Sequence, residues 1–208
     1  SESSTRFRTA LKNLQLVMTG KTLNRKQAQR QKNILAAEGY LELATALDGS
    51  CSLSLDLKKH LVDLALNSLN KVIRPAGHKP YILFLKGQAH RIAQRPRLAI
   101  TFFEQSHKID GENLHTYLAL AWCCKRTQQI DRAVKVMQAA VEMDSESCIS
   151  HYNLACYCAL NQRVDDALMH LTFALNLNPD YLTKIASESD FDSIRDNPRF
   201  ADITALAV

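Results

Sequence analysis

The side chains that could carry chemistry are spread along the chain without a metal-binding or nucleophile pattern. The seven histidines include no pair at i and i+4, the spacing that places two ligands on one helix face. The six cysteines include no C-x-x-C pair, and no Gly-x-Gly occurs that could cradle a phosphate. We therefore expect no catalytic residue, no cofactor and no metal site, and we predict that the chain is not an enzyme.

The remaining reactive groups have structural interpretations. Cys156 and Cys158 are two residues apart, so on a helix they point away from each other. We expect the cysteines to be small, mostly buried thiols in a reducing compartment. Asp165 and Asp166 are predicted to lie in the first turn of a helix, where carboxylates suit the positive end of the helix dipole, and this interpretation is favoured over a catalytic carboxylate pair.

Composition favours a mostly helical chain with one charged end. Gly and Pro, the residues that most often interrupt helices, number only 6 and 5 in 208 residues. No apolar run approaches the length of a membrane span or resembles a signal peptide. The default expectation is a cytoplasmic protein. The net charge is +5, but residues 1–34 hold eight Lys and Arg against one acid, so the basicity belongs to the N-terminal segment. Three interpretations of that segment stay open: a solvated arm, contact with an acidic partner or its own array, or nucleic-acid association.

The elements that position these residues repeat along the chain. Ala99, Ala133 and Ala167 are spaced 34 residues apart, each within a similar local sequence. Twelve residues before each alanine, and seven after it, lie further small residues: Gly87, Ala121 and Ala155, then Ser106, Ala140 and Ala174. Small residues at a fixed period are needed where paired helices approach closely, while larger apolar residues fill the grooves between pairs.

A 34-residue helix-turn-helix unit with small residues at positions 8, 20 and 27 resembles the tetratricopeptide repeat. The resemblance implies an all-α solenoid of antiparallel helix hairpins, with units at residues 80–113, 114–147 and 148–181. The third unit matches best, and Pro179 falls where the family ends its second helix. The first unit departs by placing Lys86 and His90 where large apolar and tyrosine residues are usual.

Both ends of the array have weaker patterns. Residues 32–79 form a degenerate hairpin, with helices at 32–48 and 57–73, in which Ala65 keeps the register and Gly39 would be the small residue of the first helix. Residues 1–31 form a basic N-terminal arm, in which 6–18 could add one more amphipathic helix. Residues 182–208 form a cap with apolar Phe191, Ile194, Phe200 and Ile203, and resemble the tails of bacterial members of the family.

The family resemblance implies a concave groove lined by first-helix positions 2, 5, 9, 12 and 13. We expect it to carry an aromatic patch with three cations, Arg91, Lys125 and Arg126, near one end. The alternative to an open aromatic patch is that the N-terminal helix covers some of these rings, Trp122 above all. The predicted groove residues are Tyr81, Phe84, Gln88, Arg91, His115, Leu118, Trp122, Lys125, Arg126, Ile149, Tyr152 and Cys156.

The function predicted from this groove is a protein–protein interaction adaptor or scaffold. Its partner would be a peptide or helical segment, acidic with apolar anchors. The Lys and Asn clamp that some members use for a terminal carboxylate is matched only by Asn153, so chaperone-tail binding is not expected. The alternatives are a self-associating structural subunit and nucleic-acid association through the basic arm, which no nucleic-acid motif accompanies.

Overall fold

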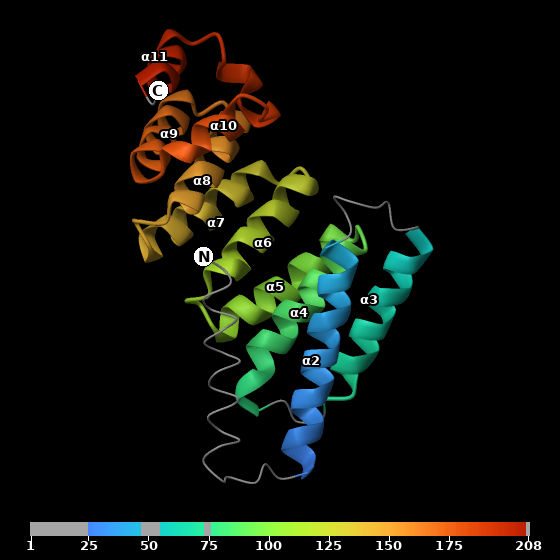
Figure 1. The fold of residues 1–208 in the computed structure, drawn as a ribbon. Helices are drawn as coiled ribbons and strands as arrows, with labels where there is room; N and C mark the ends of the chain where they lie inside the picture. Colours follow the sequence, from blue (N-terminus) through green and yellow to red (C-terminus); the bar gives the residue numbers. More distant parts are fainter. Residues whose placement is uncertain (1–24, 47–54, 73–75, 207–208) are drawn as a thin grey trace.

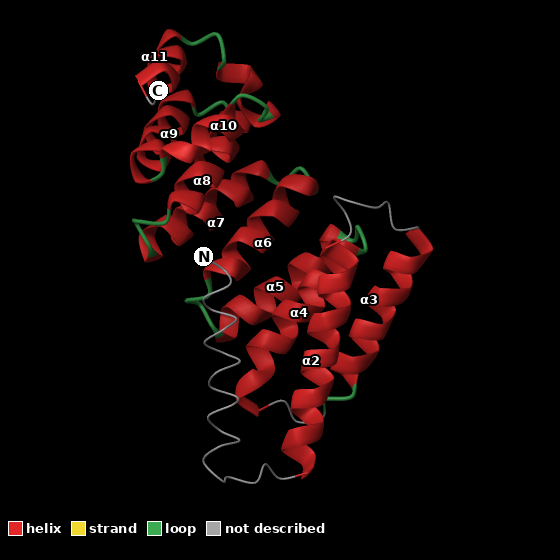
Figure 2. Ribbon diagram, in the orientation of Figure 1, coloured by secondary structure: helices red, strands yellow, loops and turns green. Residues whose placement is uncertain are grey.

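The computed structural model describes residues 25–46, 55–72 and 76–206, and every regular element in these ranges is a helix (Figure 2). The antiparallel pairs stack in chain order into a solenoid (Figure 1). The predicted all-α solenoid of helix hairpins is therefore confirmed. The helices are α2 (Arg25–Ala46), α3 (Leu55–Asn70), α4 (Lys79–Ile92), α5 (Pro96–Ile109), α6 (Leu114–Arg126), α7 (Ile130–Met143), α8 (Cys148–Leu160) and α9 (Val164–Leu177).

Shorter helices complete the described chain. The 3₁₀ turn η1 (Ala76–His78) leads into α4, and the C-terminal segment consists of η2 (Pro179–Tyr181), α10 (Leu182–Ile185), η3 (Ser189–Ile194) and α11 (Pro198–Leu206). The amphipathic run expected at 6–18 lies outside the described residues, as does the loop between α2 and α3 at 47–54. The division into an arm, a hairpin, three units and a cap stays a prediction.

The turns inside the three hairpins share one geometry. Gln94, Gln128 and Gln162 adopt left-handed backbone conformations with φ of 56°, 62° and 58°. In each turn the next N–H donates to a carbonyl five residues back, as Arg163 does to Cys158 over 2.9 Å. This is how helices commonly satisfy their last carbonyls, although glycine is the usual residue there. The same geometry at a 34-residue period shows that the repeat seen in the sequence is also a repeat of the backbone.

Polar caps and a proline begin several of the helices. The Asn113 side chain accepts a hydrogen bond from the Thr116 N–H at the start of α6, and Ser147 accepts one from the Ser150 N–H at the start of α8. Helix α5 begins at Pro96, whose missing N–H costs nothing in a first turn. These caps fix where the first helix of two hairpins starts, and with it the register of the residues that face the groove.

The close approaches lie where the repeat predicts them. Ala99, Ala133 and Ala167 are completely buried. Gly87 of α4 faces Phe103 of α5, and a Cβ atom built on Gly87 would lie only 2.5 Å from a ring carbon. Only glycine therefore fits against this fully buried ring.

The first hairpin differs from its prediction in two respects. Helix α2 begins at Arg25 rather than at residue 32. Ala65 is completely buried, in keeping with its register, but a Cβ atom on Gly39 would have no neighbour within 4 Å. The interpretation of Gly39 as the close-packing residue of α2 was wrong. That role falls to the buried Ala37 and Ala44, which lie seven residues apart on one side of the helix, away from Gly39.

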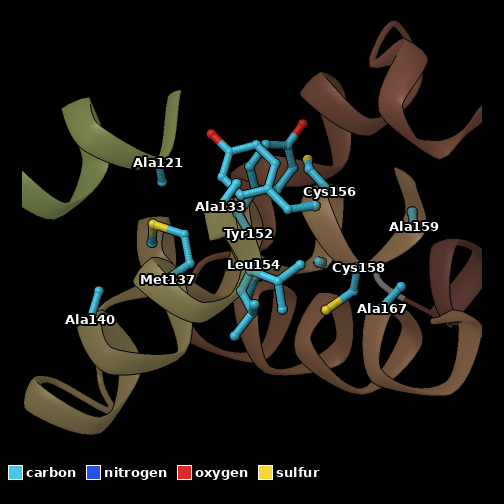
Figure 3. Packing of buried hydrophobic residues seen from close by; sticks show 14 of the residues in the cluster. Ala121, Ala133, Met137, Ala140, Tyr152, Leu154, Cys156, Cys158, Ala159 and Ala167 are labelled. Carbon is cyan, nitrogen blue, oxygen red and sulfur yellow. The ribbon is translucent and has the colours of Figure 1, made fainter. Parts of the chain in front are cut away.

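The buried apolar side chains form two clusters. The smaller joins α2, α3 and α4, and the larger runs from α5 to Phe200 in α11. Phe84 of α4 packs against both. In the larger cluster, Leu154 and Cys158 lie on one side of α8 and Tyr152 and Cys156 on the other (Figure 3). Both sides of α8 are therefore buried.

The C-terminal segment covers the end of the solenoid. Phe191, Ile194 and Phe200 are buried, and Ile203 packs against the same cluster. Its contacts are mainly with α8, through η3, and with α9. Within the part of the chain that the structure describes, no helix is long and apolar enough to cross a bilayer.

Candidate protein-binding groove

The half-buried ring of Trp122 on α6 lies between two arginines from neighbouring helices. The guanidinium carbon of Arg91 on α4 is 5.4 Å from the ring centroid, and that of Arg126 on α6 is 5.8 Å away. Both separations are within cation–π range. Neither guanidinium forms an ion pair with any other described residue. The Arg91 Nε donates to Gln88 Oε1 over 2.6 Å, and burial lowers the pKa of the Arg91 guanidinium below its usual value. The structure thus brings together four of the predicted groove residues.

The aromatic residues of α4 continue this surface toward α2. The Tyr81 and Phe84 rings stack with centroids 6.3 Å apart and planes inclined by 16°. The Tyr81 hydroxyl donates to Glu38 Oε1 of α2 over 2.5 Å, and Phe84 lies 5.8 Å from the buried Phe103 ring. On α6, His115 is exposed and Leu118 is half-buried, so this part of the groove presents apolar side chains beside the arginines.

The third unit's share of the groove is occupied by the chain's own C-terminal segment. Tyr152 is 7% exposed and Cys156 2% exposed, while Ile149 stays exposed at the start of α8. The Tyr152 ring lies 4.8 Å from Tyr181 and 5.9 Å from Phe191. In this conformation two of the predicted groove residues contact the cap rather than solvent.

Lys125, the third predicted cation, forms an ion pair with Asp190 of η3. The Asp190 side chain is 7% exposed and that of Lys125 is 31% exposed, so the pair is largely shielded from water. Sequence reasoning placed Lys125 in the groove but did not identify Asp190. The only local signal for it is the acid–aromatic–acid run at 190–192.

Cys156, Glu188 and Asp190 have potential ligand atoms within 4.8 Å of one another. Burial, followed by the charge of Asp190, raises the pKa of the Cys156 thiol well above its usual range. Because metal ions bind the thiolate, a protonated thiol is a poor ligand. The ammonium group of Lys125 already pairs with the Asp190 carboxylate, so we interpret the cluster as an ion-pair site.

A histidine pair on the other side of the third hairpin was not anticipated. His151 Nε2 lies 3.0 Å from the Ser145 carbonyl and therefore donates to it. His151 Nδ1 is then left to accept from His170 Nδ1, also at 3.0 Å. Burial and then the nearby His151 lower the pKa of His170, against a smaller opposing effect of Asp166. The two histidines are 19 residues apart, a separation that no local pattern reveals.

Comparison with known proteins agrees with this geometry. Residues 114–147, which contain α6 and α7, match a family model described as tetratricopeptide repeat. No curated protein sequence matches the chain.

The fold is similar to several solved structures. A crystal structure of MamA is 15% identical with a TM-score of 0.60, covering 72% of this chain and 85% of that one. MamA from residue 41 to its end, from Desulfovibrio magneticus RS-1, is 16% identical with a TM-score of 0.55, covering 82% and 94%. YrrB, described as a TPR protein with an unusual peptide-binding site, is 16% identical with a TM-score of 0.55, covering 75% and 85%.

The stacked hairpins define a helical-repeat fold of the solenoid class. The match over 114–147 and the 34-residue period of its turns identify which repeat this is. Residues 114–147 therefore form a tetratricopeptide repeat, and the chain as a whole has the fold of YrrB, a solved TPR protein.

Proposed function

We propose that this chain is a non-enzymatic, cytoplasmic adaptor that binds an extended or helical segment of a partner protein in the groove across α4 and α6. The observation that carries the proposal is Trp122 with Arg91 and Arg126 at its ring. Large aromatic and arginine side chains are the residues that contribute most to protein–protein binding. Two arginines without a carboxylate partner among the described residues favour an acidic segment with apolar anchors.

Two further observations support the proposal. YrrB, a similar fold, is described as having a peptide-binding site. The five cysteines that the structure describes are free thiols, in keeping with a reducing compartment.

Affinity capture followed by mass spectrometry tests the proposal. Wild type is compared with the double variant Trp122→Ala, Arg91→Ala, and with Arg97→Ala as a matched control, because Arg97 is exposed on α5. We expect the double variant to lose partners that wild type and Arg97→Ala retain, while its circular dichroism stays that of wild type. Retention of every partner by a folded double variant would refute the groove assignment.

Self-association is the second candidate function. Helix α9 exposes Met169, Phe173 and Leu177, which lie at i, i+4 and i+8 and so form one apolar row. This function predicts a dimer in light scattering that Phe173→Glu dissociates. A monomer at all concentrations would exclude it.

A further inference from the structure

The C-terminal segment packs against the first helices of the last two hairpins through one acidic and one aromatic residue. Asp190 pairs with Lys125 of α6, and the adjacent Phe191 places its completely buried ring against Tyr152 of α8. An acidic residue followed by an aromatic one is therefore bound between the first helices of two successive hairpins. The acid is held by a cation on one helix, and the ring by an aromatic side chain on the next.

The repeat places an equivalent set of residues one unit earlier. Arg91, Leu118 and Trp122 lie 34 residues before Lys125, Tyr152 and Cys156. The turns that end their helices have nearly the same backbone angle at Gln94, Gln128 and Gln162, so successive hairpins are built alike. Because each hairpin of a solenoid packs on its neighbour in the same way, residues at matching positions form matching surfaces.

We infer that Arg91, Leu118 and Trp122 form a second subsite of this kind, which binds an acidic residue followed by a bulky apolar residue in the partner. The inference rests on the proposed function, because it specifies the segment that the groove accepts. Arg91 takes the place of Lys125, and its planar guanidinium can hold a carboxylate through two hydrogen bonds. Leu118 is smaller than Tyr152 and Trp122 is larger than Cys156, so the Trp122 ring supplies most of the apolar contact in this subsite.

Charge complementarity points to an acidic partner segment rather than to the chain's own N-terminal residues. Arg91 and Arg126 lie at the same ring within 5.8 Å, so the subsite is positively charged. Residues 1–24 contain four basic side chains and one acidic one, and would add like charge. A partner carboxylate bound beside the partly buried Arg91 would instead replace the hydration that its guanidinium group loses through burial.

The chain supplies both the probe and the reporter for a test. The probe is a synthetic peptide with the sequence of residues 186–197, which contains the bound Asp190–Phe191 pair, added to the full chain. Trp122 is the single tryptophan, so its fluorescence reports on the subsite directly. We expect saturable quenching or a spectral shift that weakens with added salt. Peptides carrying Asp190→Asn or Phe191→Ala should each bind about tenfold more weakly, as loss of a charge-assisted hydrogen bond or an aromatic anchor implies.

Protein variants locate the peptide. Arg91→Ala should weaken binding about tenfold or more, whereas the matched variant Arg97→Ala should leave it unchanged. A peptide with a photo-crosslinking phenylalanine analogue in place of Phe191 should form adducts with α4 or α6. Adducts confined to α8 would mean that the peptide only displaces the native C-terminal segment, and would overturn the inference.

Failure of the inference can be told apart from failure of the proposed function. Equal affinity of wild type and Arg91→Ala, or no fluorescence change with any peptide, overturns the second subsite. If Trp122→Ala then still loses captured partners, the groove binds proteins through a different chemistry. If capture is also unaffected, both are wrong.

Discussion

Gly87→Ala adds a single methyl group at the tightest approach between two helices. The new Cβ would lie 2.5, 2.6 and 2.9 Å from three ring atoms of Phe103, where carbon atoms normally stay about 3.5–4.0 Å apart. The Phe103 ring is completely buried and packs against Phe84, so moving it would displace other core side chains. Overpacking of this kind costs about 1–3 kcal/mol. The better helix propensity of alanine returns about 1 kcal/mol.

We therefore expect Gly87→Ala to lower the free energy of unfolding by about 1 kcal/mol. Urea unfolding followed by far-UV circular dichroism measures it. With a slope of about 2 kcal/mol per molar urea, the midpoint should fall by about 0.5 M. The matched control is Gly39→Ala in α2, where a Cβ has no neighbour within 4 Å and only the propensity gain of up to about 1 kcal/mol applies.

The two substitutions should thus change stability in opposite directions. In a Phe103→Leu background, which removes the ring atoms, Gly87→Ala should become neutral or stabilising, although Phe103→Leu itself lowers stability. If Gly87→Ala raises the midpoint as much as Gly39→Ala does, the reasoning from close packing at the α4–α5 contact is refuted.

Three further outcomes are expected. Lys125→Ala should lower the free energy of unfolding in urea by about 2–3 kcal/mol, because it leaves the Asp190 carboxylate without its cation. The double variant with Asp190→Asn should recover most of that loss. A double-mutant cycle that shows no coupling between the two residues would contradict this. The lowered pKa of His170 means that the unfolded chain takes up its proton first, so stability present above about pH 6.5 should be lost as the pH falls toward the pKa of the folded state. His170→Gln should flatten that part of the pH profile of the unfolding midpoint, and an unchanged profile would exclude the His151–His170 contact as its source. Gln128→Gly should stabilise the fold by about 0.5 kcal/mol and raise the melting temperature slightly, because it relieves the strain of a left-handed backbone at a smaller cost in chain entropy. Destabilisation by more than about 1 kcal/mol would show that the Gln128 side chain has another role.

The helical pairs were predictable because the packing that makes them is local and periodic. Ala99, Ala133 and Ala167 must be small wherever two helices of a hairpin meet, and that demand recurs at the repeat period whatever the rest of the sequence does. The prediction for Gly39 was wrong because a glycine at this type of position was assumed to mark a close contact between two helices. Glycine permits a close approach without requiring one, and only the structure shows that the space beside it is open.

The proximity of Trp122 and Arg91 was predictable from the sequence, but the burial of Tyr152 was not. Trp122 and Arg91 are brought together by the repeat, so their proximity follows from their positions. The burial of Tyr152 depends instead on a segment beyond the last repeat. Lys125 and Asp190 are 65 residues apart, and nothing periodic links them. A pairing between an array and its cap is set by long-range complementarity, which one sequence does not display.

The division of the apolar interior into two clusters has a consequence for local opening. The wall of the groove that carries Arg91 belongs to α4, most of whose buried residues lie in the smaller cluster, whereas Trp122 stands on a helix of the larger one. Each cluster can open as a separate cooperative unit, and the smaller has less apolar surface to lose. A fluctuation that unpacks α2–α4 therefore parts the two sides of the groove while α6–α9 stay folded. Amide hydrogen exchange would register it as one group of α2–α4 amides opening together, ahead of the rest.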